Sequence, residues 1–314
     1  MREIVVCGEA LVDVVENPTR ESSPDRLAPL QPALGGGPFN VAITLGRLGS
    51  AVSLCSAIST DTYGTAIIGA LQASGVGTTL VQRRPEFTSL ALATIGPTGG
   101  ARYSFYVDGT ADRLVDDPGS FAPTVSAVCF GTLSMVLEPG ATVYESILRR
   151  SHTEGRLVVV DPNIRGEVID DADAYRRRFR SWVPDIDVVK LSDEDAEWLA
   201  AGPDGSTADE WLDAGVAAVV TTGGAAGVSV TTVEGAVGAA APDVTVADTI
   251  GAGDSVLGAV LHRLDRAGAL SPAGVRGLGL DGWLDVAEFA VQVAAVTVSR
   301  PGADPPWASE LRSD

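Results

Sequence analysis

The residues best suited to chemistry form the run Asp248-Thr249-Ile250-Gly251-Ala252-Gly253-Asp254-Ser255. Apolar residues with helical spacing follow it over 256–264, and residues 244–247 before it predict the end of a short β-strand. A Gly-Ala-Gly turn that opens a helix leaves backbone N–H groups unpaired at the positive end of the helix dipole. The run therefore predicts an anion site that a phosphoryl group can approach closely, with the carboxylate of Asp254 beside it. The alternative interpretation is that Asp254 only caps the helix.

Two earlier segments carry polar groups that could bind hydroxyls. Asp13 interrupts the apolar stretch Leu11-Val12-Asp13-Val14-Val15, and a carboxylate in a buried strand is costly without a partner. That partner is either a basic side chain or the hydroxyl groups of a ligand. The glycines of Gly35-Gly36-Gly37-Pro38-Phe39 precede Asn40, whose amide both donates and accepts hydrogen bonds. An ordinary turn with a cap would also explain these glycines.

The elements that must position these residues alternate along the chain. Apolar runs predict strands at 4–7, 52–58, 125–130, 157–161, 188–191 and 216–221, and helical patterns occur at 141–150, 172–182, 193–201 and 284–298. This alternation implies a parallel sheet with helices on both faces, so we predict an α/β fold with three αβα layers. Residues 88–95 and 103–107 predict a hairpin, and 17–33 a surface excursion. Ligands bind beyond the carboxyl ends of strands in such folds, which is where the candidate motifs fall.

Composition restricts the class of protein. The chain has 314 residues, of which 45% are hydrophobic and 20% charged, and this suits one globular α/β domain with an insertion. The formal net charge of −19 argues against nucleic acid and anionic membranes as partners. Neither a signal peptide nor a membrane-spanning run is evident, so we expect a cytoplasmic protein. We further expect reduced, buried cysteines and surface positions for both histidines and for the arginines at 176–180.

Several motifs, in order along the chain, resemble those of the ribokinase-like (PfkB-type) carbohydrate kinases. They are Gly-Gly-x-x-Asn-x-Ala at 36–42, Tyr103-Ser104-Phe105-Tyr106 with Ala111-Asp112, Asp161-Pro162-Asn163-Ile164-Arg165, the glycine-rich loop at 222–227 and Asp248-Thr249-x-Gly251-Ala252-Gly253-Asp254. The fructokinase branch is the most similar. The resemblance implies a single ribokinase-like domain over residues 1–314, with a small β-sheet lid formed by inserts at about 10–35 and 87–112. The sequence departs from the family pattern at Ser192 and Asp195, which replace Asn and Glu and by themselves predict a helix N-terminus.

The resemblance assigns roles to site residues in four groups. Asp254 would be the catalytic base, and the N–H groups of Gly251, Ala252 and Gly253 would stabilise the transferring phosphoryl group. The sugar would contact Asp13, Gly36, Gly37, Asn40, Phe105, Asn163 and Arg165. The nucleotide would contact Lys190, Ser192, Thr222, Gly223, Gly227 and Ala294. Asp195 would act on Mg²⁺ through water, and main-chain groups of Asp248, Ile250, Thr297, Arg300 and Gly302 would hold a monovalent cation.

The reaction implied is transfer of the γ-phosphoryl group of ATP to a hydroxyl of a small sugar, D-fructose first among the candidates, with Mg²⁺ and K⁺ as candidate ions. Asp254, its pKa lowered by the helix dipole, would take the hydroxyl proton late in the reaction. 2-Keto-3-deoxygluconate, ribose and nucleosides remain open as substrates. A sugar- or nucleotide-binding regulator on the same fold is the alternative without catalysis. The edge of the lid sheet also allows a homodimer.

Overall fold

The computed structural model describes residues 2–16, 29–95 and 101–311, which are built around one large sheet. Within these residues the large sheet has nine strands in the order β13-β12-β11-β10-β9-β8-β1-β4-β5. The parallel strands are β1 (Glu3–Cys7), β4 (Val52–Ser59), β5 (Val81–Arg84), β8 (Val125–Gly131), β9 (Leu157–Asp161), β10 (Val188–Ser192) and β11 (Ala218–Thr222). β12 (Val228–Thr232) and β13 (Gly235–Ala239) are antiparallel. The predicted, mainly parallel sheet is confirmed.

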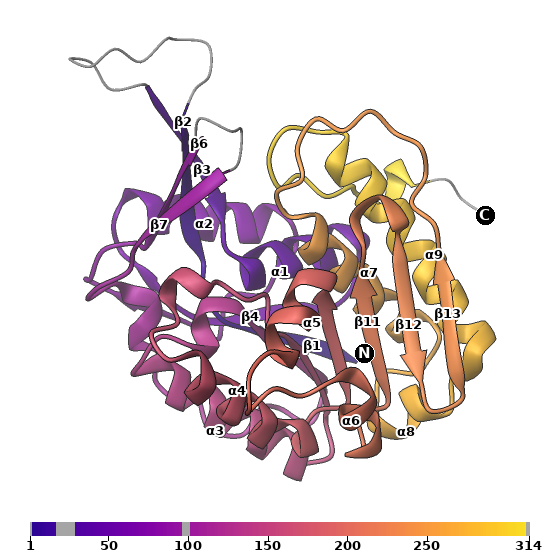
Figure 1. Ribbon diagram of the computed structural model, residues 1–314. Helices are drawn as coiled ribbons and strands as arrows, with labels where there is room; N and C mark the ends of the chain where they lie inside the picture. Colours follow the sequence, from indigo (N-terminus) through magenta and orange to yellow (C-terminus); the bar gives the residue numbers. More distant parts are fainter. Residues whose placement is uncertain (1, 17–28, 96–100, 312–314) are drawn as a thin grey trace.

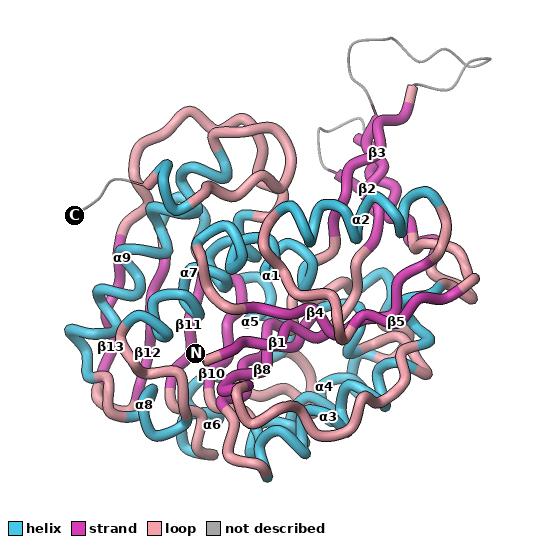
Figure 2. Tube along the Cα trace, turned by 180° about the vertical axis from the view of Figure 1, so that it is seen from behind, coloured by secondary structure: helices cyan, strands magenta, loops and turns pink. Residues whose placement is uncertain are grey.

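Helices cover both faces of this sheet (Figures 1 and 2). One face carries α1 (Gly37–Leu48), α2 (Thr62–Ala73), α7 (Ala252–Arg266), α8 (Pro272–Arg276) and α9 (Gly279–Val298). The other carries α3 (Gly140–Thr153), α4 (Ala172–Trp182), α5 (Asp193–Ala200) and α6 (Ala208–Asp213). Because successive strand residues point to opposite faces, Val6 of β1 packs in the first core and Val5 in the second. The three-layer prediction is confirmed.

A small sheet projects beyond the body of the molecule (Figure 1). It has the order β3-β2-β6-β7 and consists of β2 (Leu11–Glu16), β3 (Leu30–Gly35), β6 (Leu90–Ile95) and β7 (Ala101–Tyr106). β6 and β7 form the predicted antiparallel hairpin, while β2 pairs with β6 in parallel. Residues 96–100, which join the two strands of the predicted hairpin, and most of the surface excursion predicted at 17–33 lie outside the described residues. Residues 30–33 belong to β3 instead, because they pair with β2.

Polar side chains tie the small sheet to the body of the molecule. The carboxylate of Asp61, the N-cap of α2, accepts hydrogen bonds from the backbone N–H and the hydroxyl of Thr88, just before β6. The hydroxyl of Ser89 lies within hydrogen-bond distance of Thr110 and donates to Asp112, both of which follow β7. Asp112 therefore contributes to the base of the small sheet. Both ends of the β6–β7 hairpin are anchored.

The structure differs from the sequence-based expectations in several places. No strand forms at 244–247: the N–H of Ala247 donates to the carbonyl of Val298 at the end of α9, so this apolar run has no strand partner. The surface position expected for Arg176 is wrong, because its guanidinium stacks on Trp198 and bonds to Asp173. His262 is half-buried within hydrogen-bond distance of the Ser50 hydroxyl.

Two further expectations concern cysteines and membranes. Cys7, Cys55 and Cys129 are buried free thiols, as predicted. Among the described residues, no helix combines the length and apolar character that crossing a bilayer requires.

Candidate active site

Gly251, Ala252 and Gly253, here called the glycine turn, open α7. Gly251 is the N-cap and has a left-handed φ of 75°. A Cβ at this position would also lie 2.5 Å from Cβ of Ala303, so both the conformation and the space favour glycine. The first turn of a helix leaves backbone N–H groups without partners inside the helix, and here the N–H of Ala252 donates to the carbonyl of Thr249 before the helix. The local sequence therefore produces the predicted helix N-terminus, and its role as an anion site stays a prediction.

Asp254 is the third residue of α7 and does not cap it. No side chain caps this helix, and the Oδ2 atom of Asp254 instead accepts a hydrogen bond of 2.8 Å from the Asn40 amide on α1. The alternative that Asp254 is only a cap is therefore wrong. Asn40 fixes the orientation of the carboxylate from a segment 214 residues away in the sequence.

Burial sets the proton affinity of Asp254. The side chain is largely buried, and this burial raises its pKa, while Lys190, Asn40 and Arg165 act in the opposite direction. The sequence led us to expect a pKa lowered by the helix dipole. That expectation is wrong, because removal of the carboxylate from water outweighs the favourable interactions. Asp254 is consequently a stronger base than the helix dipole alone would make it.

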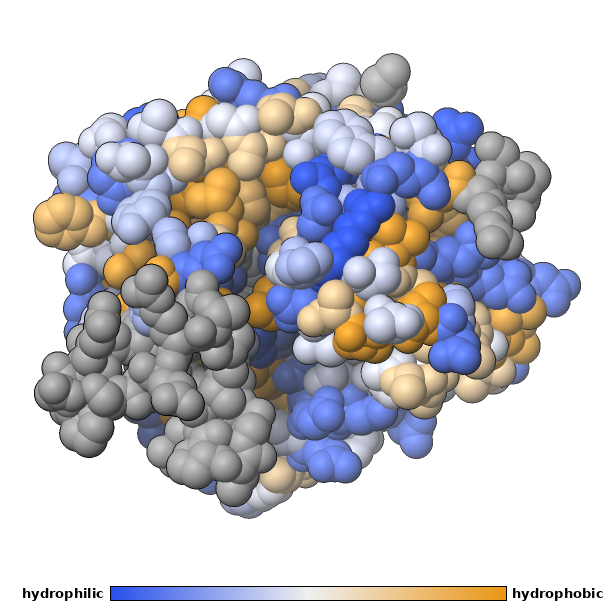
Figure 3. Space-filling model, turned by 90° about the horizontal axis from the view of Figure 1, so that it is seen from above, coloured by the Kyte–Doolittle hydropathy of each residue, from blue (hydrophilic) through white to orange (hydrophobic). Residues whose placement is uncertain are grey.

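A cavity of about 250 Å³ lies beside Asp254, beyond the carboxyl ends of β1 and β9. Figure 3 looks onto this end of the molecule and shows the surface hollowed near its centre. The cavity collects residues predicted from the sequence, and these are Asp13, Gly36, Gly37, Asn40, Phe105, Asn163, Arg165, Lys190, Ile250, Gly251, Gly253 and Asp254. All seven residues predicted to contact the sugar thus line one cavity together with the predicted base. Ala252 is not among the lining residues.

The cavity also has lining residues for which no role was predicted, and these are Glu9, Leu11, Ala91, Tyr103, Leu133 and Thr249. Tyr103 could have been found, because it lies two residues before Phe105 and therefore on the same side of a strand. The two rings stack with centroids 6.0 Å apart. Leu11 has the same relation to Asp13 on β2. Leu133 has no local signal, because it enters the cavity from the segment after β8.

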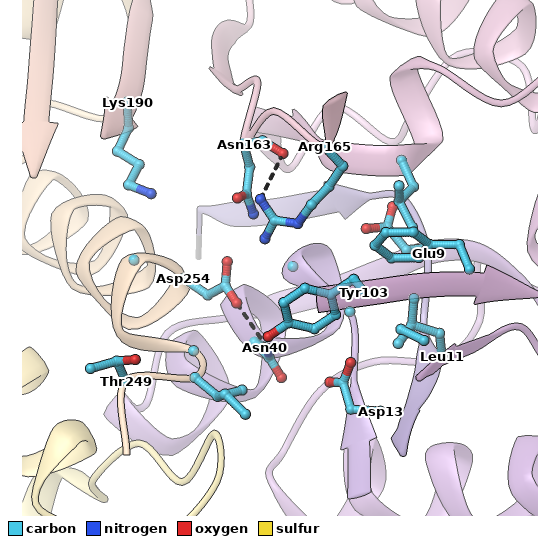
Figure 4. A pocket seen from close by; sticks show the side chains of 18 residues that line it. Glu9, Leu11, Asp13, Asn40, Tyr103, Asn163, Arg165, Lys190, Thr249 and Asp254 are labelled. Carbon is cyan, nitrogen blue, oxygen red and sulfur yellow. Dashed lines mark hydrogen bonds between the residues drawn. The ribbon is translucent and has the colours of Figure 1, made fainter. Parts of the chain in front are cut away.

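The cavity contains more acidic than basic side chains (Figure 4). Burial raises the pKa of Glu9 to about 7 and that of Asp13 to about 6, with Asp254 adding to the shift of Asp13. The cations are Arg165 and Lys190. The guanidinium of Arg165 donates to the backbone carbonyls of Asn163 and Ile164, and among the described residues it has no carboxylate within 4.0 Å. Several acceptors for hydroxyl groups thus face one guanidinium across the cavity.

Ser192 and Asp195 form a capping box at the start of α5. The Ser192 hydroxyl accepts from the N–H of Asp195, and the Asp195 carboxylate accepts from the N–H groups of Ser192 and Ile164. Because both carboxylate oxygens already bind backbone N–H groups, Asp195 fits a role toward Mg²⁺ through water better than direct ligation. The nucleotide role of Ser192 and the metal role of Asp195 stay predictions.

The residues predicted to bind the nucleotide lie mostly outside the cavity. Thr222 pairs in register with Ser192 at the ends of β11 and β10, and the N–H of Gly223 donates to the carbonyl of Gly227 to close the loop. Ala294 is half-buried on α9. Lys190 is the one member of this predicted group that lines the cavity. The roles of the others stay predictions.

Two segments predicted to hold a monovalent cation lie side by side. The carboxylate of Asp248 accepts from the N–H groups of Ile250 and Gly302, and the N–H of Arg300 donates to the carbonyl of Thr297. The structure thus brings the five predicted residues into one neighbourhood. In the described part of the chain, His, Cys, Asp and Glu form no cluster of three or more that could hold a metal ion. The cation site stays a prediction.

Comparison with known proteins is consistent with this geometry. The pattern of the family described as pfkB family carbohydrate kinase matches residues 1–310. A fructokinase from Rhizobium leguminosarum bv. trifolii is 34% identical over 264 residues, which cover 83% of this chain and 79% of the relative. The crystal structure of a fructokinase with bound ATP from Xylella fastidiosa is similar with a TM-score of 0.85 and 26% identity, covering 96% of this chain and 93% of that one. Aminoimidazole riboside kinase from Salmonella enterica, at 22% identity and a TM-score of 0.77 over 96% of this chain and 95% of its own, shares the fold.

Proposed function

The chain belongs to the pfkB family of carbohydrate kinases, and on this premise we propose that it transfers the γ-phosphoryl group of ATP to a hydroxyl of D-fructose. One observation carries the proposal: the carboxylate of Asp254 and the two glycines of the glycine turn meet in a single cavity with the side chains of Asp13, Asn40 and Arg165. A base, an anion site and hydroxyl-binding groups are what such a transfer requires.

The residues of the cavity have different roles in the transfer reaction. Asp254 accepts the proton of the attacking hydroxyl while the bond from its oxygen to phosphorus forms and the bond from phosphorus to the ADP oxygen breaks. The N–H groups of Gly251 and Gly253 stabilise the charge on the transferring group, and each such donor contributes on the order of 3 kcal/mol. The N–H of Ala252, which donates to the carbonyl of Thr249, contributes less. Bound Mg²⁺ would neutralise further phosphate charge. Asp195 is suited to bind the water shell of that ion.

The charge of the cavity supports a neutral polyhydroxy sugar. Glu9, Asp13 and Asp254 offer acceptors to hydroxyl groups, and they would repel an anionic ligand in this part of the cavity. The similar fructokinase from Rhizobium leguminosarum bv. trifolii also points to fructose. The small sheet, which contributes Asp13, Tyr103 and Phe105, would act as a lid that limits access of water to the phosphoryl group.

A second substrate, 2-keto-3-deoxygluconate, has one observation in its favour. Its carboxylate would need a cation, and the Arg165 guanidinium has no carboxylate within 4.0 Å among the described residues. The same guanidinium is equally suited to phosphoryl oxygens. For this reason we place the acidic sugar second.

A phosphorylation screen tests the proposal. ADP formation is measured with ATP and Mg²⁺ and, in turn, D-fructose, 2-keto-3-deoxygluconate, ribose or adenosine. We expect kcat/KM for D-fructose to exceed the others by at least tenfold. Preference for the acidic sugar would move the assignment to the second substrate. Binding of a sugar without turnover of any of the four would favour a non-catalytic regulator.

A further inference from the structure

We propose that Asp161 is a positioning residue for phosphoryl transfer, which holds the ammonium group of Lys190 at the glycine turn and away from the carboxylate of Asp254. The inference rests on the proposed function. Asp161 is the last residue of β9 and does not line the cavity, so it acts through Lys190 and not on a substrate.

Asp161 and Lys190 form a buried ion pair between neighbouring parallel strands. The Nζ atom of Lys190 donates to Oδ2 of Asp161 at 2.8 Å, and the two side chains are 4% and 5% exposed. Burial alone would lower the pKa of Lys190, but the carboxylates of Asp161, Asp254 and Asp195 together raise it by more, so the net shift is upward. Lys190 therefore carries its positive charge inside the protein.

The ammonium group lies against the glycine turn. A Cβ on Gly253 would be only 2.8 Å from Nζ of Lys190, and Lys190 lines the cavity. An ammonium has three donors, of which Asp161 uses one. Figure 4 shows the Lys190 side chain extending toward the side of the cavity that holds Asp254. The remaining donors are thus available to an anion bound at the turn.

Asp161 keeps Lys190 apart from the base. Lys190 has its ion pair with Asp161, and no ion pair within 4.0 Å joins it to Asp254. Direct pairing would stabilise the ionised carboxylate of Asp254 and so weaken it as a base. Asp161 thus allows the ammonium group of Lys190 to contact the phosphoryl group without pairing directly with Asp254 and weakening it as a base.

A buried ion pair is weak evidence for a gain in stability. The second oxygen of Asp161, Oδ1, is buried and has no hydrogen-bond partner among the described residues. A buried ion pair with an unsatisfied oxygen is often no more stable than an apolar pair of the same size. The cost of this arrangement is consistent with a role in function.

A pH profile of Asp254 reports on this role, and several groups face Asp254 from the surrounding elements. The charged or titratable ones are Lys190 on β10, Asp161 on β9, Arg165 after β9, Asp13 on β2 and Cys129 on β8, and Asn40 on α1 is the polar one. Replacement of Asp161 by Asn keeps an acceptor for Lys190 but removes the negative charge. The uncompensated ammonium should then lower the pKa of Asp254.

The test compares Asp161→Asn with the wild-type protein, using single-turnover rates and pH profiles with the sugar that the wild type phosphorylates. We expect the rate to fall at least tenfold, the KM for the sugar to change less than threefold, and the acid limb of the profile to move to lower pH. Addition of Lys190→Met should return the limb toward the wild-type position while the rate stays low. An unchanged rate and an unchanged limb in folded Asp161→Asn would overturn the proposal.

Asp187→Asn is the matched control, because Asp187 is also buried and paired, with Arg276, far from the cavity. This variant should lower Tm without changing the single-turnover rate or the position of the acid limb of the pH profile. If Asp161→Asn fails to fold, it is replaced by the double variant Asp161→Asn/Lys190→Met, which leaves no unpaired charge. A single-turnover rate of this double variant within twofold of wild type would overturn the proposal. Failure of the proposed function is distinguishable, since then the wild type itself phosphorylates no sugar.

Discussion

The glycine turn and the small sheet face the same cavity but are held in different ways. Asp254 and Lys190 beside the turn are 8% and 4% exposed and are fixed by the packed core of the large sheet. Asp13, Tyr103 and Phe105 of the small sheet are half-buried and depend on strand pairing and on the anchors at Asp61 and Ser89. Preorganised dipoles are most effective where burial keeps them fixed. We infer that the turn carries the chemistry and the small sheet the recognition of the sugar.

Among the tests of this contrast, we expect the largest effect from Asp254→Asn. The amide keeps the shape of the carboxylate but cannot accept the hydroxyl proton, so we expect kcat to fall about a thousandfold or more, as for loss of a general base. The KM values for sugar and ATP should change less than threefold. Steady-state kinetics and calorimetric binding check this. A parallel loss of binding and turnover would contradict the assignment of the chemistry to the turn and of sugar recognition to the small sheet, because Asp254 would then be a structural group.

The next largest expected effect is on the free energy of unfolding and comes from Glu9, which lies between β1 and β2. Burial raises its pKa from 4.5 to about 7, so the folded protein holds this proton more tightly than the unfolded chain does. The free energy of unfolding should therefore fall by about 3 kcal/mol as pH rises through this window. Glu9→Gln should remove most of this dependence, although Asp13, with its pKa raised to about 6, contributes in the same direction.

Urea unfolding at pH 5, 6, 7 and 8 measures the effect of Glu9→Gln. The exposed Glu234 provides the control, and Glu234→Gln should leave the pH dependence as in the wild type. An unchanged slope for Glu9→Gln would mean that Glu9 stays hydrated, contrary to its 1% exposure.

Asp13→Asn tests the small sheet in the same terms as Asp254→Asn tests the turn. A hydrogen bond to a charged group contributes about 1.5–3 kcal/mol, so the KM for the sugar should rise about tenfold or more. The kcat at saturating sugar should change less than threefold. Asp108→Asn, at an exposed carboxylate just beyond β7, is the control and should change neither value. A loss confined to kcat would assign Asp13 to the chemistry instead.

Phe105→Ala should give the smallest effect. The ring lines the cavity and stacks on Tyr103, and loss of an aromatic contact typically costs about 1 kcal/mol, which corresponds to a rise in sugar KM of about fivefold. Tyr106 is the neighbouring residue on the opposite face of β7 and is 60% exposed. Tyr106→Ala should leave the KM unchanged. Equal rises in sugar KM for the two variants would show that the effect comes from a disturbance of β7, and not from loss of a side chain that faces the cavity.

Much of the fold and of the site could be predicted because the patterns involved are local. Apolar runs predicted β1, β4, β8, β9, β10 and β11 of the large sheet, and helical spacing predicted α3, α4 and α7. The glycine turn was predictable from three adjacent residues, since a positive φ and close approach both demand glycine. The run at 244–247 was misassigned for the same reason: a local apolar pattern cannot reveal that no neighbouring strand is available.

The sequence alone determined which residues form the turn, which segments form six parallel strands of the large sheet and which polar residues follow those strands. Only the tertiary structure decided that Asn40 orients Asp254, that Asp161 holds Lys190, and that burial raises the pKa of Asp254. These pairs join segments up to 214 residues apart. Desolvation and ion pairing depend on which distant segments pack together, and no spacing along the chain records that.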